Sequence, residues 1–252
     1  MQDFTNFVVA ITGGNSGIGL ETAIAFKAKG AKVAIFGRDQ ATLDHAAQAH
    51  GFVTHKGDVI NRAQLEAFFL QVKTELGAVD AVFANAGIAE FLPFEAAPSD
   101  HYDRVFDVNV KGVINTVQAA LPVLNTPASI VLTTSVANRM GEPNTSVYSA
   151  SKAAVRSLAK TLSTELLPRG VRVNCISPGP TDTPIFSKMG LEGAALDGTK
   201  DFIATRIPAG RMGQSADVAQ AVLYLASKEA GFVAGTEIVV DGGFSNSAVL
   251  PS

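Results

Sequence analysis

Short runs rich in apolar and β-branched residues alternate along the chain with longer amphipathic segments, and this alternation restricts the possible folds more than any other feature. Most of the short runs are almost continuously apolar, which is typical of parallel strands covered on both faces. The pattern predicts a doubly wound α/β fold, a parallel sheet with helices on both sides. Seven strands are predicted, at 7–12, 32–36, 52–58, 78–87, 129–135, 171–177 and 237–243. The predicted helices are 17–29, 39–50, 61–76, 101–124, 147–167 and 214–227, with Gly30 ending the first and Asn61 capping the third.

One region does not follow this alternation. Residues 178–213 are rich in Gly and Pro and come directly after the sixth predicted strand. Because ligands bind beyond the carboxyl ends of parallel strands, we expect a substrate lid at about 184–213. No linker, internal repeat or low-complexity tract divides the rest of the sequence. The sequence therefore predicts a single domain over residues 1–252, long enough to bury a full core.

Charge and cysteine content argue against several classes of function. The formal net charge is −3 and there is no long basic run, so no nucleic-acid partner is expected. Cys175 is the only cysteine and lies in an apolar run, so it cannot form an intrachain disulfide and indicates a small buried side chain. The four histidines have no carboxylate at a metal-ligand spacing, so no metal is expected.

The hydrophobic runs are short, and none approaches the ~20 apolar residues that a membrane span needs. The first residues have neither a basic start nor a small-residue cleavage site. We therefore expect a soluble, cytoplasmic protein with no membrane partner.

A glycine-rich turn joins the first strand to the first helix, and it reads Thr12-Gly13-Gly14-Asn15-Ser16-Gly17-Ile18-Gly19. In the first βα turn of such a sheet, glycines let the backbone approach a pyrophosphate, and the helix N-terminus supplies free N–H groups and a partial positive charge. The alternative is a tight turn whose glycines serve only its conformation. The position of the turn favours dinucleotide binding. The candidate cofactor contacts in the turn are Gly13, Asn15, Ser16, Gly17, Ile18 and Gly19.

Tyr148 and Lys152 stand four residues apart in the stretch VYSASKA, on one face of a predicted helix. A tyrosine with a pKa of about 10 is a weak acid for proton transfer near neutral pH. A neighbouring ammonium group favours phenolate and lowers the tyrosine pKa. Ser135, at the end of the fifth predicted strand, can hold the substrate oxygen beside the tyrosine. Taken singly, these residues also fit a packing pair, a solvated charge and a turn cap.

Together, the TGGNSGIG turn and the downstream VYSASKA motif resemble the short-chain dehydrogenase/reductases, and the resemblance covers residues 7–243. Within that family the chain is similar to NADP-dependent ketoreductases and secondary alcohol dehydrogenases, which have a Rossmann fold. Further landmarks of the family follow in order: Asp58-Val59, Asn85-Ala86-Gly87, Asn109, Ser135 and Pro178-Gly179. One departure is Ala84, which stands where the family usually has a first asparagine and is expected to loosen one local hydrogen bond.

The resemblance implies a role for each landmark. Tyr148 is the acid/base, Lys152 also binds the nicotinamide ribose, and Ser135 holds the substrate oxygen. Asn109 accompanies a kink in its helix and holds a water on a proton path to the lysine, which makes these four the candidate catalytic residues. On the cofactor side, the resemblance implies adenine contacts at Asp58 and Val59, adenosine-ribose contacts at Asn85, Ala86 and Gly87, and contacts to the carboxamide and phosphates at Pro178, Gly179, Thr181 and Thr183.

The residues after the second strand bear on which nucleotide is bound. An NAD-preferring dehydrogenase usually has an acid at the end of this strand, and Gly37 occupies that place. Arg38 is suited to pair with a 2′-phosphate and to stack on adenine. We therefore expect NADP(H) to be the preferred cofactor. An inward-turned Asp39 would select NAD(H) instead, and the remaining alternative is an Arg38 in solvent with Asp39 capping a helix.

The substrate is expected to be a fairly hydrophobic ketone or secondary alcohol. Its predicted pocket is lined by Val136, Ala137, Asn138, Met140, residues 143–145 and apolar residues of the lid, namely Ile185, Phe186, Met189, Leu191, Leu196, Phe202 and Ile203. Two alternatives stay open. One is a 3-oxoacyl-(acyl carrier protein) reductase, for which Arg169 matches a carrier-docking position, and the other is an NADP(H)-binding sensor without turnover. The resemblance also implies a homotetramer built through the helices 101–124 and 147–167 and the C-terminal strand.

Overall fold

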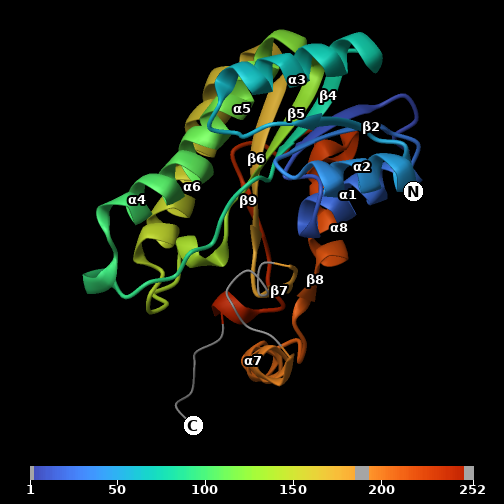
Figure 1. Ribbon diagram of the computed structural model, residues 1–252. Helices are drawn as coiled ribbons and strands as arrows, with labels where there is room; N and C mark the ends of the chain where they lie inside the picture. The colour runs from blue at the N-terminus through green and yellow to red at the C-terminus, as the bar shows by residue number, and fades with distance from the viewer. Residues whose placement is uncertain (1–2, 185–192, 247–252) are drawn as a thin grey trace.

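A seven-stranded parallel sheet forms the centre of the molecule in the computed structural model, which describes residues 3–184 and 193–246 (Figure 1). Its strands run in the order β3-β2-β1-β4-β5-β6-β9. Their bounds are Val8–Thr12 (β1), Lys32–Gly37 (β2), Val53–Lys56 (β3), Val79–Ala84 (β4), Leu124–Thr133 (β5), Val171–Pro178 (β6) and Glu237–Val240 (β9). The order reverses between β1 and β4, which makes the edge beyond these two strands a topological switch point where ligands bind. The predicted doubly wound fold is confirmed.

Helices cover both faces of this sheet (Figure 1). Their bounds are Gly17–Ala28 (α1), Gln40–His50 (α2), Arg62–Glu75 (α3), Ser99–Phe106 (α4), Gly112–Ala120 (α5), Ser146–Leu166 (α6), Gly193–Thr205 (α7) and Ser215–Ala226 (α8). Side chains of β1 alternate between two hydrophobic clusters. Val8 and Ala10 pack in the cluster that contains α3, α5 and α6, and Val9 and Ile11 pack in the cluster that contains α1, α2 and α8. Burial on both faces explains why the strands read as continuous apolar runs.

Local capping follows the sequence where it was predicted. The Asn61 side chain accepts a hydrogen bond from the Gln64 amide at 3.3 Å and caps α3. Gly30, with φ +91°, reverses the chain after α1, a left-handed conformation that glycine adopts without strain. Cys175 is buried in β6, as its apolar surroundings predicted.

The predicted continuous helix 101–124 is wrong, because it is divided into α4, a π-helical segment at Asp107–Lys111, and α5. Asn109 lies within this π segment and is fully buried. Single π turns of this kind are frequent at functional sites and bend the helix that contains them. A π segment therefore lies where the family resemblance implied a kink.

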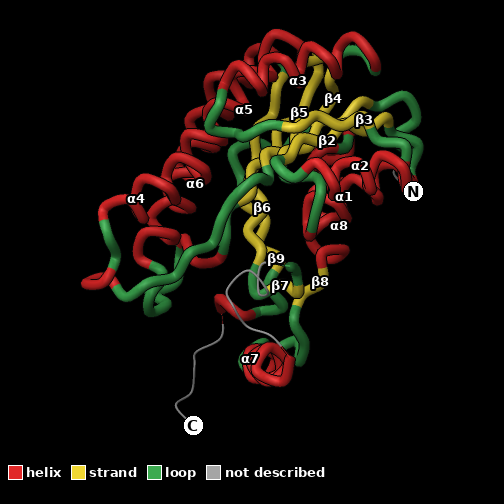
Figure 2. Tube along the Cα trace, in the orientation of Figure 1, coloured by secondary structure: helices red, strands yellow, loops and turns green. Residues whose placement is uncertain are grey.

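The region 178–213 is more regular than its Gly and Pro content predicted. It contains α7 and a small two-stranded parallel sheet, in which β7 (Thr181–Asp182) pairs with β8 (Gly213–Gln214). Because β7 follows β6 directly, α7 lies beyond the carboxyl ends of the main strands (Figure 2). The predicted pocket residues Ile185, Phe186, Met189 and Leu191 lie outside the described residues. Among the helices of the described part, none has both the length and the hydropathy to cross a bilayer.

Candidate active site

Residues from several strands meet at the carboxyl edge of the sheet. The glycine turn follows β1, Asn85 follows β4, Ser135 comes two residues after β5, and β6 ends at Pro178. Because the strands are parallel, all four segments lie at the same edge. The motifs that are scattered through the sequence are therefore brought together at the switch point.

The glycine turn is packed so closely that Gly13, Gly14 and Gly19 leave no space for a side chain. A Cβ on Gly13, which has φ +65°, would lie 2.9 Å from the Ala86 Cα, and one on Gly19 would lie 2.1 Å from the Gly13 carbonyl oxygen. The Asn85 amide group donates to the same Gly13 carbonyl at 3.2 Å. The conformation and close packing of the turn are therefore enough to explain glycine at positions 13 and 19, where the turn lies against the end of β4.

The beginning of α1 has the features of an anion cradle. Ser16 stands at the N-cap, but its side chain makes no capping hydrogen bond, so it does not occupy the first N–H groups of α1. Gly17 has φ +52° and faces Thr183, which would lie 3.5 Å from a Cβ at that position. Ile18 packs partly buried against the core below. A helix N-terminus left open in this way fits the pyrophosphate of a dinucleotide.

At the end of β2, the Asn15 side chain occupies the space beside Gly37. A Cβ there would lie 2.5 Å from the Asn15 Oδ1 atom, and the Asn15 amide nitrogen donates to the Thr42 hydroxyl at 2.8 Å. The Asp39 carboxylate accepts a hydrogen bond from the Thr42 amide at 2.8 Å and caps α2. Asp39 therefore caps α2 in this structure, which is one of the predicted alternatives.

Arg38 and Asp58 lie at the same corner. The Arg38 side chain is 66% exposed, and its guanidinium is 3.9 Å from the Asp58 carboxylate, which is too long for a tight ion pair. The Asp58 carboxylate also accepts from the Ile60 amide at 3.2 Å, and Val59 is buried beneath it. The geometry leaves the guanidinium available to an anion at the solvent edge.

The segment after β4 is fixed by two threonines. The amides of Asn85 and Ala86 donate to the Thr12 hydroxyl at 3.2 and 3.3 Å, and the Thr133 hydroxyl donates to the Asn85 side chain at 3.3 Å. Ala84, where the family usually has asparagine, is the buried last residue of β4, and the bonds just described are made without it. Gly87 lies close to the next group of residues, since a Cβ on it would be 3.3 Å from the Lys152 Nζ atom.

Tyr148, Lys152 and Ser135 come together at the start of α6. The Lys152 ammonium lies 5.8 Å from the centre of the Tyr148 ring and donates to the Thr133 carbonyl at 3.0 Å. Burial raises the pKa of the partly buried Tyr148, and a hydrogen bond with Ser135 opposes that rise. In the protein alone, desolvation therefore outweighs the lowering that the sequence predicted for this tyrosine. The phenol stays protonated at neutral pH.

Asn109 makes hydrogen bonds to residues next to Tyr148 and Lys152. Its side chain accepts from the Ile88 amide at 2.8 Å and donates to the Ile88 carbonyl at 3.0 Å and to the Ser151 hydroxyl at 3.1 Å. Ser151 lies between Tyr148 and Lys152 in the sequence, so Asn109 connects the segment after β4 to the first turns of α6. This one side-chain amide therefore links the π segment Asp107–Lys111 to α6.

Lys152 is buried, and burial lowers its pKa from 10.5 to about 8. In the unfolded chain the lysine keeps its ordinary pKa, so between about 8 and 10.5 the unfolded state binds more protons than the folded state. The free energy of unfolding is therefore expected to rise, relative to that of Lys152→Met, as the pH is raised from about 8. Urea denaturation of both proteins across this range measures the difference. A difference that stays constant or falls would contradict the burial of a charged lysine.

The segment after β6 completes the site. Gly179 is packed against Asp241, whose Cβ would lie 2.5 Å from a Cβ at that position, and the Thr181 hydroxyl donates to the Gly179 carbonyl at 2.9 Å. Thr183 then reaches Gly17, as described above. The neighbouring Asp182 pairs with Lys200 of α7 at 2.8 Å, which ties α7 to this segment.

Phe91 was missed by the sequence analysis. Its ring lies edge-on to the Tyr148 ring, with centres 5.4 Å apart, and the residue is 39% exposed. The only signal in the sequence was a Phe in the loop that follows the fourth predicted strand.

Of the predicted pocket residues, Val136 is buried in the core, whereas Phe202 of α7 is exposed.

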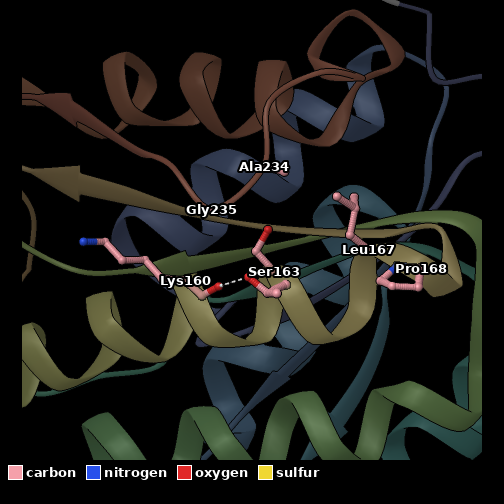
Figure 3. Close-up of a pocket in the computed structure, with 7 residues that line it drawn as sticks. Lys160, Ser163, Leu167, Pro168, Ala234 and Gly235 are labelled. Atoms are coloured by element: carbon pink, nitrogen blue, oxygen red, sulfur yellow. Dashed lines mark hydrogen bonds between the residues drawn. The ribbon is translucent and has the colours of Figure 1, made fainter.

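A cavity of about 660 Å³ lies elsewhere, between the second half of α6 and the residues before β9 (Figure 3). Lys160, Leu167 and Gly235 are among its lining residues, and none of the predicted site residues is. This cavity is therefore separate from the candidate active site. Within residues 3–184 and 193–246, no three His, Cys, Asp or Glu side chains are grouped so that they could hold a metal ion.

Comparison with known proteins adds relatives that match the chain nearly end to end. A family profile described as enoyl-(acyl carrier protein) reductase matches residues 13–245. The oxidoreductase asL5 of Sarocladium schorii is 39% identical over 249 residues, covering 97% of this chain and 98% of that protein. A 3-oxoacyl-[acyl-carrier-protein] reductase of Thermotoga maritima is 34% identical over 243 residues, covering 94% of this chain and 96% of that protein. A solved short-chain dehydrogenase/reductase from Brucella melitensis, titled glucose/ribitol dehydrogenase, superposes with a TM-score of 0.90 at 32% identity, covering 96% of this chain and 98% of that chain.

Proposed function

The chain belongs to the short-chain dehydrogenase/reductase family of oxidoreductases, and from that premise we propose that it transfers a hydride between NADP(H) and the carbonyl or secondary alcohol carbon of a fairly hydrophobic ketone or alcohol. Tyr148 is the acid/base in this proposal. The observation that carries it is the meeting of Ser135, Tyr148 and Lys152 at the sheet edge, beside the open start of α1. Ser135 also caps the turn that follows it, where its hydroxyl accepts from the Ala137 amide at 3.3 Å, but that role does not require Tyr148 and a buried Lys152 nearby.

The protein residues supply binding and the proton. When bound, the dinucleotide supplies the hydride. In the reduction direction, the Ser135 hydroxyl holds the substrate oxygen, and the Tyr148 phenol donates its proton to that oxygen as negative charge develops on it. The raised pKa of Tyr148 keeps this proton in place at neutral pH before the reaction. After transfer, the phenolate is stabilised by the nearby Lys152 ammonium, which also marks where the nicotinamide ribose would lie.

The residues around the glycine turn would hold the rest of the cofactor. Pyrophosphate fits the uncapped start of α1 with Ser16 and Thr183, and the adenosine ribose fits the segment Asn85–Gly87. Asp58 and Val59 would lie beside the adenine. Thr181 with its backbone would orient the carboxamide.

Preference for NADP(H) is supported by the space at Gly37 and the charge at Arg38. A side chain at position 37 would have to displace the Asn15 side chain, and Asp39 is engaged in capping α2. Arg38 is then the charged side chain placed to meet a 2′-phosphate. NAD(H) use requires Asp39 to leave its cap.

Arg38→Asp is expected to raise the KM for NADPH about 10-fold to 100-fold, since a charge-assisted hydrogen bond to phosphate contributes about 1.5–3 kcal/mol. The KM for NADH should stay the same or fall. Steady-state kinetics with both cofactors measure the change, and Lys73→Asp, at the far end of α3, is the charge-matched control. An unchanged ratio of the two KM values would show that Arg38 does not select the cofactor.

Two aromatic residues near the site support the proposal of a hydrophobic substrate. Phe91 stands edge-on to Tyr148, and Phe202 is presented on α7 beyond the same edge. We propose that residues 184–213 act as a substrate lid, with α7 held by the Lys200–Asp182 pair. The test is a panel of ketones and secondary alcohols of graded hydrophobicity, assayed with NADPH and NADH. Preference for sugar substrates would overturn the substrate class while leaving the reaction intact.

A second candidate is a 3-oxoacyl-(acyl carrier protein) reductase, which the Thermotoga maritima relative favours. Arg169, the proposed carrier contact, follows α6 at the end opposite to Tyr148. At ~1.5 Å per residue this separates the two along the helix by about 30 Å, so Arg169 does not reach the Tyr148 of its own chain. Faster turnover of an acyl-carrier β-ketoester than of simple ketones would favour this second candidate.

We also propose a homotetramer that assembles through α4–α6 and β9. Sedimentation velocity of the purified protein tests this oligomeric state.

A further inference from the structure

Glu237 opens β9, the edge strand, and its carboxylate is almost completely buried, with a side-chain exposure of 6%. Four side chains from two other elements converge on it. We propose that Glu237 is a positioning residue, which fixes the segment carrying Ser135 against the helix carrying Tyr148. The inference rests on the proposed function, because it concerns the geometry of the same proton-transfer site.

Three of the four contacts come from residues on both sides of Ser135. The Thr134 hydroxyl, whose single proton can go to the Glu237 Oε1 atom at 2.8 Å or to the Ile176 carbonyl at 2.9 Å, lies beside the carboxylate. The Asn138 amide nitrogen donates to the same Oε1 atom at 2.5 Å. The Arg139 guanidinium pairs with the other oxygen. Ser135 itself does not touch Glu237, but its neighbours are held at one carboxylate. The backbone at Ser135 is therefore restrained from both directions.

The fourth contact comes from α6. The Arg156 Nε atom lies 3.0 Å from the Glu237 Oε2 atom. Arg156 follows Tyr148 by eight residues and Lys152 by four, so all three lie along one face of the helix. One carboxylate thus links the catalytic face of α6 to the segment around Ser135.

A carboxylate is the group that can make these contacts together. It has two acceptor oxygens and a negative charge for two guanidinium groups, whereas a neutral side chain offers neither the charge nor the same number of acceptors. Hydrogen bonds from Thr134, Asn138 and Arg139 keep the pKa of Glu237 low despite its burial. The strand pairing fixes the carboxylate in turn, since Glu237 is in register with Cys175 of β6.

The fold is expected to survive removal of this charge. The Arg139 and Arg156 side chains are 30% and 36% exposed, although the Arg156 Nε atom that faces Glu237 is itself buried. Glu237→Gln keeps the shape of the side chain, and its melting temperature should stay within a few degrees of the wild type. Binding of NADPH, followed by nucleotide fluorescence, should be unchanged.

Turnover is expected to fall in Glu237→Gln. Displacement of a reacting group by about 1 Å can cost about 100-fold in rate, so we expect kcat to fall about 10-fold to 100-fold with little change in the KM for NADPH. Glu229→Gln, an exposed glutamate in the same part of the chain, is the matched control and should keep the wild-type kcat.

The decisive comparison uses the Ser135→Ala background. If Glu237 acts through Ser135, the double variant Ser135→Ala/Glu237→Gln should be no more than about twofold slower than Ser135→Ala alone. Independent losses that multiply in the double variant, or a kcat of Glu237→Gln within about twofold of the wild type, would overturn the inference. If Glu237→Gln fails to fold, Arg156→Gln tests the same link from α6 with the same two outcomes.

The proposed function and the role of Glu237 are rejected by different results. A wild-type protein that reduces ketones, together with an inactive Tyr148→Phe variant, keeps the proposed function whatever Glu237→Gln does. An active Tyr148→Phe variant rejects the proposed function, whereas additive losses reject only the role of Glu237.

Discussion

Tyr148→Phe is expected to lose at least about 1,000-fold in kcat for ketone reduction while the protein stays folded and still binds NADPH. The substitution removes only the phenol oxygen, and a positioned general acid contributes about 100-fold to 10,000-fold to such a step. The aromatic ring, with its edge-on contact to Phe91, remains. Stopped-assay detection of the alcohol product measures the residual rate, and nucleotide fluorescence measures binding.

The matched control for this variant is Tyr224→Phe. Tyr224 lies on α8, on the other face of the sheet, so the same loss of a phenol oxygen should leave kcat unchanged. If Tyr148→Phe kept more than about one tenth of the wild-type kcat, the phenol would not be the proton donor. The ring would then be a packing residue beside Phe91.

Lys152→Met is expected to have the second-largest effect, a loss of at least about 100-fold in kcat together with weaker binding of NADPH. The ammonium lies 5.8 Å from the Tyr148 ring centre and beside Gly87, so its removal takes away both the charge that stabilises the phenolate and a partner of the cofactor ribose. Methionine fills the buried space left by the lysine stem, and near neutral pH it removes the cost of burying a charge. The variant should therefore be as stable as the wild type.

Lys160→Met is the control on the same helix, two turns further from Tyr148 and exposed. Kinetics and NADPH binding of the two variants, measured side by side, separate a local role of Lys152 from a general effect of positive charge on α6. Equal losses in both variants would assign the effect to net charge, and wild-type kinetics in Lys152→Met would remove the lysine from the mechanism.

The strand and helix pattern was predictable because burial on both faces leaves a direct mark on the sequence. Val8 to Ile11 are apolar at every position, and the structure divides them between the two cores. The π segment at Asn109 was not predictable from periodicity, and its Asn109 side chain bonds to Ile88, which comes from another part of the chain. Helix α7 was missed because Gly and Pro content indicates loops, although a helix can form between such residues.

The candidate site followed a similar division. Tyr148, Lys152 and the glycine turn could be proposed from the sequence because each proposal depends on spacing within a short stretch. The contacts of Phe91 and Glu237 could not, since they are made with residues far away in the sequence. A charged residue at the start of an apolar strand, together with Arg156 on the face of Tyr148, was the only signal of the Glu237 network.

The most direct test of the central claim is the oxidation of NADPH by the purified wild-type protein in the presence of a panel of hydrophobic ketones, followed by loss of reduced-nicotinamide absorbance. The proposed chemistry predicts turnover of at least one ketone, faster with NADPH than with NADH. Binding of NADPH without turnover across the whole panel would contradict it and favour a nucleotide sensor.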